Sequence, residues 1–151
     1  MRSGLSLMLI LLGALLESAP AQQPVDRSAD EAAIRATVQA FIDSRENNDR
    51  AGLAALLLPE ADQRVTSGNM RAGRDAVVDG SLNTTARIGG RRRISLETFR
   101  FLGPNVAIGD GPYDVVDRND GPDRHYLTAI VFQRVAGEWK INAIRNVQPV
   151  Q

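Results

Sequence analysis

Two apolar runs near the C-terminus consist largely of strand-forming residues. The segment from His125 to Val147 reads HYLTAIVFQRVAGEWKINAIRNV, and its runs flank Val135-Ala136-Gly137-Glu138, as expected of a hairpin. With a loop of two or four residues, the cross-strand partners share one face of the sheet. The predicted pairs are Phe132 with Ile141, Ile130 with Ala143, Thr128 with Arg145, and Tyr126 with Val147. A three-residue loop would turn one strand over and undo this assignment.

The face defined by these pairs changes from apolar to polar along the hairpin. Near the turn it carries Phe132, Trp139 and Ile141, and further along it carries Tyr126, Thr128 and Arg145. This gradient predicts a sheet that covers a core at one end and opens into a pocket at the other. These six side chains are the predicted ligand-binding residues.

The opposite face of the hairpin is half apolar. It is predicted to carry Leu127, Ala129, Val131 and Ile144 among Lys140, Asn142 and Asn146. Because contiguous apolar surface often marks an interface, we expect a homodimer through this outer face.

Helical periodicity marks the first half of the chain. Ile34, Val38, Phe41 and Ile42 fall on one stripe of a helix from about Ala29 to Glu46, with Arg45 assigned off the stripe. Ser28 and Glu31 have the spacing of a capping box. Further helices are predicted from Asp49, as the cap, to just before Pro59, and from Gly73 to about Gly89-Gly90.

Strand patterns occupy the rest of the chain. Ala61 to Ser67 is a short candidate, Arg92 to Leu102 alternates as one strand, and Val106 to Val116 is a second strand. Gly109, Gly111 and Pro112 interrupt this second strand and predict a bulge or sharp bend. The order of elements predicts an α+β fold, with N-terminal helices packed on a curved antiparallel sheet.

The first 21 residues are predicted to be a signal peptide. Arg2 precedes an apolar run from Leu5 to Leu16, and Ala19-Pro20-Ala21 fits a cleavage site. The run is shorter than the roughly 20 residues that span a bilayer, and a retained anchor is the alternative. The remaining chain divides into a disordered leader (22–27) and one domain (28–149), exported to the periplasm or outside the cell, with no membrane contact after cleavage.

Composition excludes several classes of chemistry. The chain has no cysteine and a formal net charge of zero, so it has no thiolate chemistry and is a poor candidate for binding nucleic acid. Arg91-Arg92-Arg93 is interpreted as a solvated strand edge. The sequence contains neither a G-x-G-x-x-G nor an H-E-x-x-H nor a G-x-S-x-G motif, and no cofactor or metal is expected.

Three residues are the candidates for catalysis. Arg145 would share the inner face with Trp139 and could bind a carboxylate, or it could form a structural ion pair with Asp62, Asp110 or Asp114. Asp110 would act as an acid or base if an apolar pocket raised its pKa, and would otherwise line a solvated loop. The Tyr126 hydroxyl could stabilise an oxyanion, or it could belong to an ordinary core residue.

The chain also resembles the NTF2-like superfamily, in particular its SnoaL-like and DUF4440 group. The resemblance rests on DEAAIRATVQAFIDSRENND, GLAALLLPEADQRVT, MRAGRDAVV and GEWKINAIRNVQP, and covers about residues 28 to 149. It implies a cone in which a bent sheet wraps a long helix, with a pocket at the open end. Known members of the group bind small, largely apolar ligands and include isomerases, cyclases and dehydratases, although no complete catalytic signature is present here.

Three functions therefore stay open. The first is an exported protein that binds a small apolar or weakly acidic ligand in the cone. The second is an isomerase, cyclase or dehydratase that uses acid and base residues in the same pocket. The third is a structural dimer whose cone is filled by side chains.

Overall fold

The computed structural model describes residues 25–149. The predicted signal peptide and the first residues of the leader, up to 24, lie outside this range. The described helices are α1 (Ser28–Glu46), α2 (Arg50–Ala55) and α3 (Arg74–Ile88). The described strands are β1 (Leu57–Arg64), β2 (Met70–Ala72), β3 (Gly89–Ile94), β4 (Thr98–Phe101), β5 (Val106–Arg118), β6 (Arg124–Val135) and β7 (Glu138–Val147).

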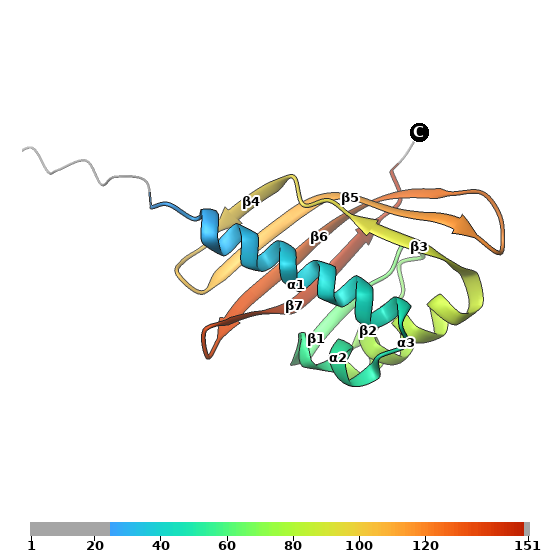
Figure 1. Ribbon diagram of the computed structural model, residues 1–151, viewed down its shortest axis with the longest axis horizontal. Coiled ribbons are helices and arrows are strands. Elements are labelled where there is room, and N and C mark those ends of the chain that lie inside the picture. Colours follow the sequence, from blue (N-terminus) through green and yellow to red (C-terminus); the bar gives the residue numbers. More distant parts are fainter. Residues whose placement is uncertain (1–24, 150–151) are drawn as a thin grey trace, which may run out of the picture.

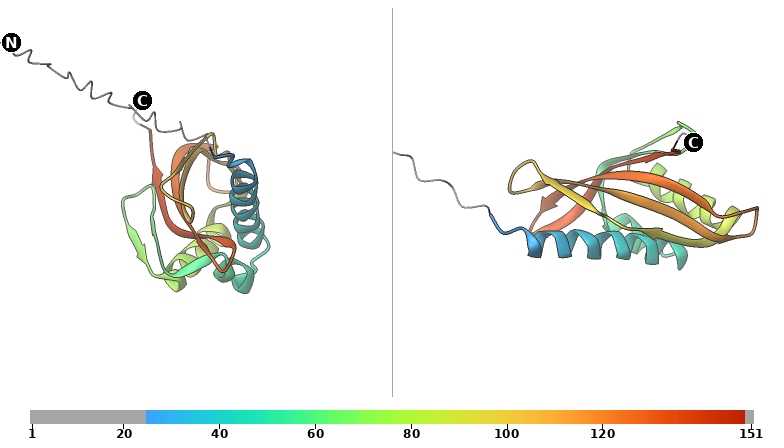
Figure 2. Two further views of the ribbon diagram at one scale, coloured as in Figure 1. Left: turned by 90° about the vertical axis from the view of Figure 1, so that its left-hand side faces the viewer. Right: turned by 90° about the horizontal axis from the view of Figure 1, so that it is seen from above.

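One curved sheet carries the whole fold. Its strand order is β2-β1-β7-β6-β5-β3, with β4 also paired to β5, and β1 runs parallel to β7 whereas the other pairs are antiparallel. Figure 1 shows α1 lying along one face of the sheet, with α2 and α3 gathered at one of its ends. The end-on view in Figure 2 shows the sheet curling around this helix. The predicted α+β architecture is confirmed.

The helix α1 buries the predicted stripe. Ile34, Val38, Phe41 and Ile42 are all buried, but so is Arg45, which makes its assignment off the stripe wrong. The predicted capping box is also wrong. The helix begins at Ser28 itself, whose backbone N–H donates to the Asp26 carboxylate at 2.9 Å, so an upstream side chain caps the helix in place of the Ser28 hydroxyl.

Asp49 caps α2 as predicted, because its carboxylate accepts a hydrogen bond from the Gly52 N–H at 2.9 Å. The helix then ends earlier than its leucine pattern suggests. Leu57 belongs to β1 and pairs with Ile141, and the Ile141 N–H donates to the Leu56 carbonyl at 2.8 Å. Pairing with β7 therefore overrides the local helical pattern.

The predicted strand from Arg92 to Leu102 is two strands. Ile94 pairs with Tyr113 and Thr98 with Asp110, so this side holds one extra residue, and the intervening Leu96 is buried in the core. A Cβ at Gly111 would lie 2.0 Å from the Ser95 carbonyl oxygen. The expected bulge in β5 therefore belongs to the facing strand, and β5 pairs with β6 without interruption from Val106 to Val115.

The β6–β7 hairpin follows the predicted register only near its turn. Ala136 and Gly137 form a two-residue loop with φ of 51° and 84°, as in a type I′ turn, and Phe132 pairs with Ile141 as expected. At Asn142 the register shifts by one residue. Beyond this bulge the predicted pairs are wrong: Ile130 faces Ile144, Thr128 faces Asn146, and Ala129 faces Arg145.

The bulge exchanges the faces of the last β7 residues. Ile144 is 3% exposed and joins the core, whereas Arg145 lies on the outer face. A β-bulge inserts one unpaired residue and inverts the side-chain alternation beyond it. A regular period of two, assumed from the sequence, cannot detect such an inversion.

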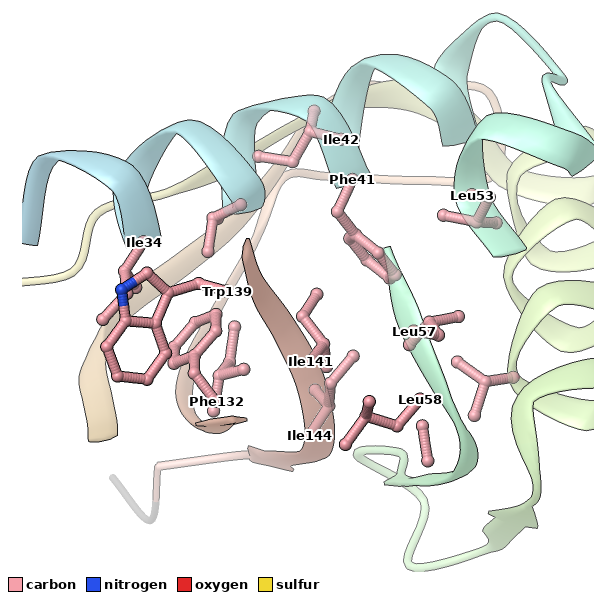
Figure 3. Packing of buried hydrophobic residues seen from close by; sticks show 14 of the residues in the cluster. Ile34, Phe41, Ile42, Leu53, Leu57, Leu58, Phe132, Trp139, Ile141 and Ile144 are labelled. Atoms are coloured by element: carbon pink, nitrogen blue, oxygen red, sulfur yellow. The ribbon is translucent and has the colours of Figure 1, made fainter. Parts of the chain in front are cut away.

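The main core fills the closed end of the curved sheet (Figure 3). Phe41 of α1 and Leu53 of α2 pack towards Leu57 of β1, and Phe132, Trp139 and Ile141 come from the hairpin. Fully burying one such side chain stabilises the fold by about 1.5–3 kcal/mol. The Thr37 hydroxyl donates to the Trp139 carbonyl at 3.1 Å, which ties α1 to β7.

Candidate ligand-binding site

A cavity of about 380 Å³ lies at the end of the sheet away from the β6–β7 turn. Its lining comes from α1, β1, the β1–β2 loop, β2, α3 and strands β5 to β7. The lining combines four arginines with two tyrosines, several amides and hydroxyls, and the apolar Val65, Ile88 and Val115. Its arginines are Arg45, Arg71, Arg87 and Arg124. The predicted change from an apolar to a polar inner face thus leads into a real hollow.

A small second core forms the apolar wall of this cavity. Ile88, Tyr113, Val115 and Tyr126 pack together, and the two tyrosine rings lie 5.6 Å apart between centroids. Aromatic walls of this kind provide contact area for a ring or hydrocarbon body.

Arg45 enters the cavity from the last turn of α1. Its side chain is almost fully buried, with the residue 6% exposed, and its Nε donates to Thr85 Oγ1 at 2.8 Å. Burial lowers the pKa of this guanidinium to about 10; the neighbouring Tyr113 opposes the shift, and the charges of Arg92 and Arg71 add to it. A buried charge next to like charges is an unusual and costly arrangement.

Arg71 approaches the same region from β2. Its two terminal nitrogens donate to Gln63 Oε1 and Thr84 Oγ1, each at 2.8 Å. Burial lowers its pKa, and Tyr113 partly offsets this effect. Neutral partners thus orient the guanidinium without neutralising its charge.

Arg92 lies on the inner side of β3, and its charge acts on Arg45. The residue is 4% exposed, and within residues 25–149 its side chain donates only to the Gly90 carbonyl, at 3.3 Å. Its Nε and second terminal nitrogen have no hydrogen-bond partner within residues 25–149. Glu46 is the adjacent acid, but its carboxylate accepts from the Arg92 backbone N–H, at 2.6 Å. The interpretation of Arg91-Arg92-Arg93 as a solvated edge therefore holds for the exposed Arg91 and Arg93 and is wrong for Arg92.

Two further arginines stand at the mouth of the cavity. Arg124 donates to the Tyr126 hydroxyl at 3.3 Å, and this hydrogen bond raises the pKa of Arg124. Arg87 is exposed on α3. Positive charge therefore extends from the rim to the interior of the hollow.

The structure distributes the predicted ligand-binding residues over three places. Tyr126 lines the cavity. Thr128 is on the inner face as predicted and donates to Asn146 Oδ1 at 2.8 Å, and this asparagine lines the cavity. Phe132, Trp139 and Ile141 are also on the inner face, but they belong to the main core at the closed end.

Asp110 and Arg145 lie together on the outer face of the sheet. They line a separate hollow of about 360 Å³, in which Asp110 accepts a hydrogen bond from the Thr98 hydroxyl at 2.6 Å. Arg145 forms a two-pronged ion pair with Asp62, at 2.6 and 3.2 Å. This pair is the structural alternative that the sequence left open for Arg145.

Sequence reasoning missed Arg45, Arg71, Arg92 and Tyr113 as residues of the site. For two of them a signal was present. Arg45 follows Ile42 by three residues and Phe41 by four, and therefore falls on the buried stripe of α1. Arg92 shares the alternation of Ile94. A charged residue at an apolar position of a periodic pattern is the kind of conflict that marks a site.

Within the described range, no three acidic or histidine side chains come together as a metal site would require. None of the helices between residues 25 and 149 is long and apolar enough to cross a membrane.

Comparison with solved structures identifies the fold. A domain of unknown function with a cystatin-like fold from Nostoc punctiforme superposes with a TM-score of 0.70 at 22% identity, over 82% of this chain and 80% of that one. A candidate dehydratase from the NTF2-like family of Streptomyces avermitilis gives 0.70 at 15% identity, over 83% of this chain and all of that one. An NTF-2-like protein from Shewanella oneidensis gives 0.66 at 11% identity, over 78% and 98%.

The chain thus has the NTF2-like fold, an α+β cone in which helices pack against a curved, mostly antiparallel sheet. At these identities the similarity establishes the fold alone. No family model matches the sequence, and no curated protein matches it. The narrower resemblance to the SnoaL-like and DUF4440 group stays a prediction.

Proposed function

We propose that this chain is an exported protein that binds a small molecule in the open end of its NTF2-like cone. The cavity itself carries the proposal, because its volume of about 380 Å³ falls within the roughly 300–1,000 Å³ of typical ligand sites. An apolar wall of two tyrosines faces a group of polar and charged side chains, which is the usual composition of such sites. A cone filled by side chains, the structural alternative, would leave no hollow of this size.

Catalysis is the second candidate, and the two tyrosines keep it open. The Tyr113 hydroxyl, beside the buried Arg45, and the Tyr126 hydroxyl, which accepts from Arg124 at the rim, could stabilise negative charge that develops on a bound substrate. Of the predicted catalytic residues, however, only Tyr126 lines the cavity, since Asp110 and Arg145 line the outer hollow. Binding is therefore the first proposal, and any ligand found to bind should then be assayed for turnover.

Export is the part of the proposal that depends on the N-terminal sequence. We expect the mature chain to begin at Gln22, after Ala19-Pro20-Ala21. Expression of the whole chain in a bacterium, followed by mass spectrometry of the periplasmic fraction, tests this. Recovery of a chain that retains Met1 in the membrane fraction would favour the retained anchor.

A thermal-shift screen of the purified protein against small apolar acids, ketones and lactones tests the binding proposal. A ligand present at a hundred times its dissociation constant adds about 2.7 kcal/mol to the free energy of unfolding, which raises the melting temperature by on the order of 10 °C. A Thr66→Trp variant should abolish the shift, because Thr66 is a half-buried lining residue whose enlargement would fill the mouth.

Leu127→Trp is the matched control for that variant. It places the same indole in the outer hollow, against the exposed Leu127 position, and should leave the ligand shift unchanged. A ligand shift that survives in Thr66→Trp and disappears in Leu127→Trp would move the site to the outer face and refute the proposal.

A further inference from the structure

The open end of the cone contains positive charge that the protein does not neutralise. Arg45 and Arg92 are both more than nine-tenths buried, and in the described chain neither side chain forms an ion pair. Arg71, whose charge also acts on Arg45, is held by an amide and a hydroxyl. None of the described residues that line the cavity carries a carboxylate.

Two other partly buried arginines of this protein form ion pairs with acids. Arg145 is paired with Asp62, and Arg134 with Asp30. The fold therefore has acids available where an arginine serves only to hold elements together. An unpaired buried charge is destabilising, so the cluster of Arg45, Arg71 and Arg92 points to a partner that comes from outside the chain.

We propose that the cavity takes a small organic acid, whose carboxylate pairs with Arg45 and Arg71 and whose apolar or aromatic body lies against Tyr113 and Tyr126. This inference rests on the proposed function and specifies its ligand class. Arg92 contributes charge from behind the pair. The planar guanidinium group matches a carboxylate through paired N–H donors, and such charge-assisted bonds strengthen in a poorly solvated site.

The dimensions of the site agree with this ligand class. A cavity of about 150 Å³ is enough to hold benzene, so about 380 Å³ accommodates a substituted ring with its carboxylate. Ile88 and Val115 complete the apolar wall. Arg87 and Arg124 at the rim would attract an anion to the mouth before it reaches the buried pair.

Matched pairs of acids and amides provide the test. Calorimetric titration of the intact protein with benzoate and phenylacetate, at constant ionic strength, is compared with benzamide, phenylacetamide and inorganic phosphate. We expect each acid to bind at least tenfold more tightly than its amide. Phosphate should bind more weakly than either acid, because it has no body to contact the tyrosines.

Substitutions then assign the binding to the cluster. Arg45→Met and Arg71→Met should each reduce the affinity for benzoate at least tenfold and bring it to the level of benzamide. Arg93→Met is the control, since Arg93 is exposed and its immediate neighbour Arg92 points inward; it should bind benzoate as the unmodified protein does. Thermal melts of each variant without ligand show which of them is folded, and two independent arginines protect the test against the failure of one.

The outcomes separate this inference from the proposed function. If acids and amides bound with equal affinity, and Thr66→Trp abolished the binding of both, the ligand would not be selected as an anion. The inference would then fail, while the proposal that the cavity binds a small molecule would stand. Phosphate that binds as tightly as benzoate, or benzoate binding that survives both Arg45→Met and Arg71→Met, would also overturn the inference. If no acid, amide or phosphate bound and the broader screen gave no shift, both proposals would fail.

Discussion

At the scale of single residues, Arg45 places a buried positive charge at the open end of the cone, and this charge affects both stability and ligand binding. Its guanidinium is buried, its Nε donates to Thr85, and burial lowers its pKa to about 10. Without ligand, the folded state therefore holds a charge that the unfolded state would leave in water. Sites of this kind trade stability for function.

We expect Arg45→Met to stabilise the protein in the absence of ligand. Methionine fills similar space without a charge, and the gain in the free energy of unfolding should be about 0.5–2 kcal/mol. Urea denaturation at pH 7 measures it. Arg93→Met, at an exposed position, should change stability by less than about 0.5 kcal/mol. A loss of stability in Arg45→Met would contradict the idea that its unpaired charge destabilises the folded protein, and would mean that the hydrogen bond to Thr85 contributes more than the burial of the charge costs.

The same residue predicts a pH dependence. The pKa of Arg45 is lower in the folded protein, about 10, than in an unfolded chain, so between these values the unfolded state binds more protons and stability rises with pH. The advantage of Arg45→Met over the unmodified protein should therefore be complete below pH 10 and shrink as the pH rises above 10. Paired denaturation curves at pH 8 and pH 11 test this, and a difference that grew with pH would contradict it.

The contrast between Arg45 and Arg145 shows what sequence could predict at this scale. The sequence pattern placed Arg145 on the inner face of the sheet and Arg45 off the buried stripe of its helix. In the structure Arg145 lies on the outer face, paired with Asp62, whereas Arg45 is buried inside the cone. The partner of Arg145 is 83 residues away in the chain and that of Arg45 is 40 residues away, and local periodicity carries no information about such partners.

At the scale of elements, two one-residue irregularities decide which side chains reach the inner face of the sheet. The bulge at Asn142 brings Ile144 and Asn146 to the inner face and moves Arg145 to the outer face. The extra residue between β3 and β4 sends Leu96 into the core. The sequence predicted the order and type of most elements, because periodicity is a property of each segment. It assigned one bulge to the wrong strand and missed the other, since bulges depend on the paired strand.

Gly111 allows the second irregularity, and its replacement by alanine should be destabilising. The new Cβ would lie 2.0 Å from the Ser95 carbonyl oxygen, so the bulge would have to move away from β5. We expect a loss of about 1–3 kcal/mol, as for other overpacking substitutions. Chemical denaturation measures it.

Gly103 provides the matched control for that substitution. A Cβ added at Gly103 would have no atom within 4 Å, so Gly103→Ala should fall within about 0.5 kcal/mol of the unmodified protein. Equal effects of the two substitutions would show that the contact at Ser95 does not constrain the strands.

At the scale of the whole molecule, the two faces of the sheet have different proposed functions, ligand binding on the inner face and association on the outer face. Its inner face holds the core at one end and the charged cavity at the other. Its outer face exposes about half of Leu127 and of Val147, at 49% and 55%, beside the hollow that contains Asp110 and Arg145. Apolar side chains around a hollow of this kind favour association.

We propose that two copies of the chain associate through this outer face, as the hairpin pattern suggested. Analytical ultracentrifugation at micromolar concentration should show a dimer. Leu127→Asp should convert it to a monomer, because the substitution would bury a carboxylate at the centre of the apolar surface. Leu102→Asp changes a similarly exposed leucine, in the loop after β4, and should remain dimeric.

A monomer for the unmodified protein, or equal dissociation of both variants, would refute this interface. Since the cavity opens on the inner side of the sheet, the Leu127→Asp monomer should still bind benzoate, so that assembly and ligand binding can be tested independently.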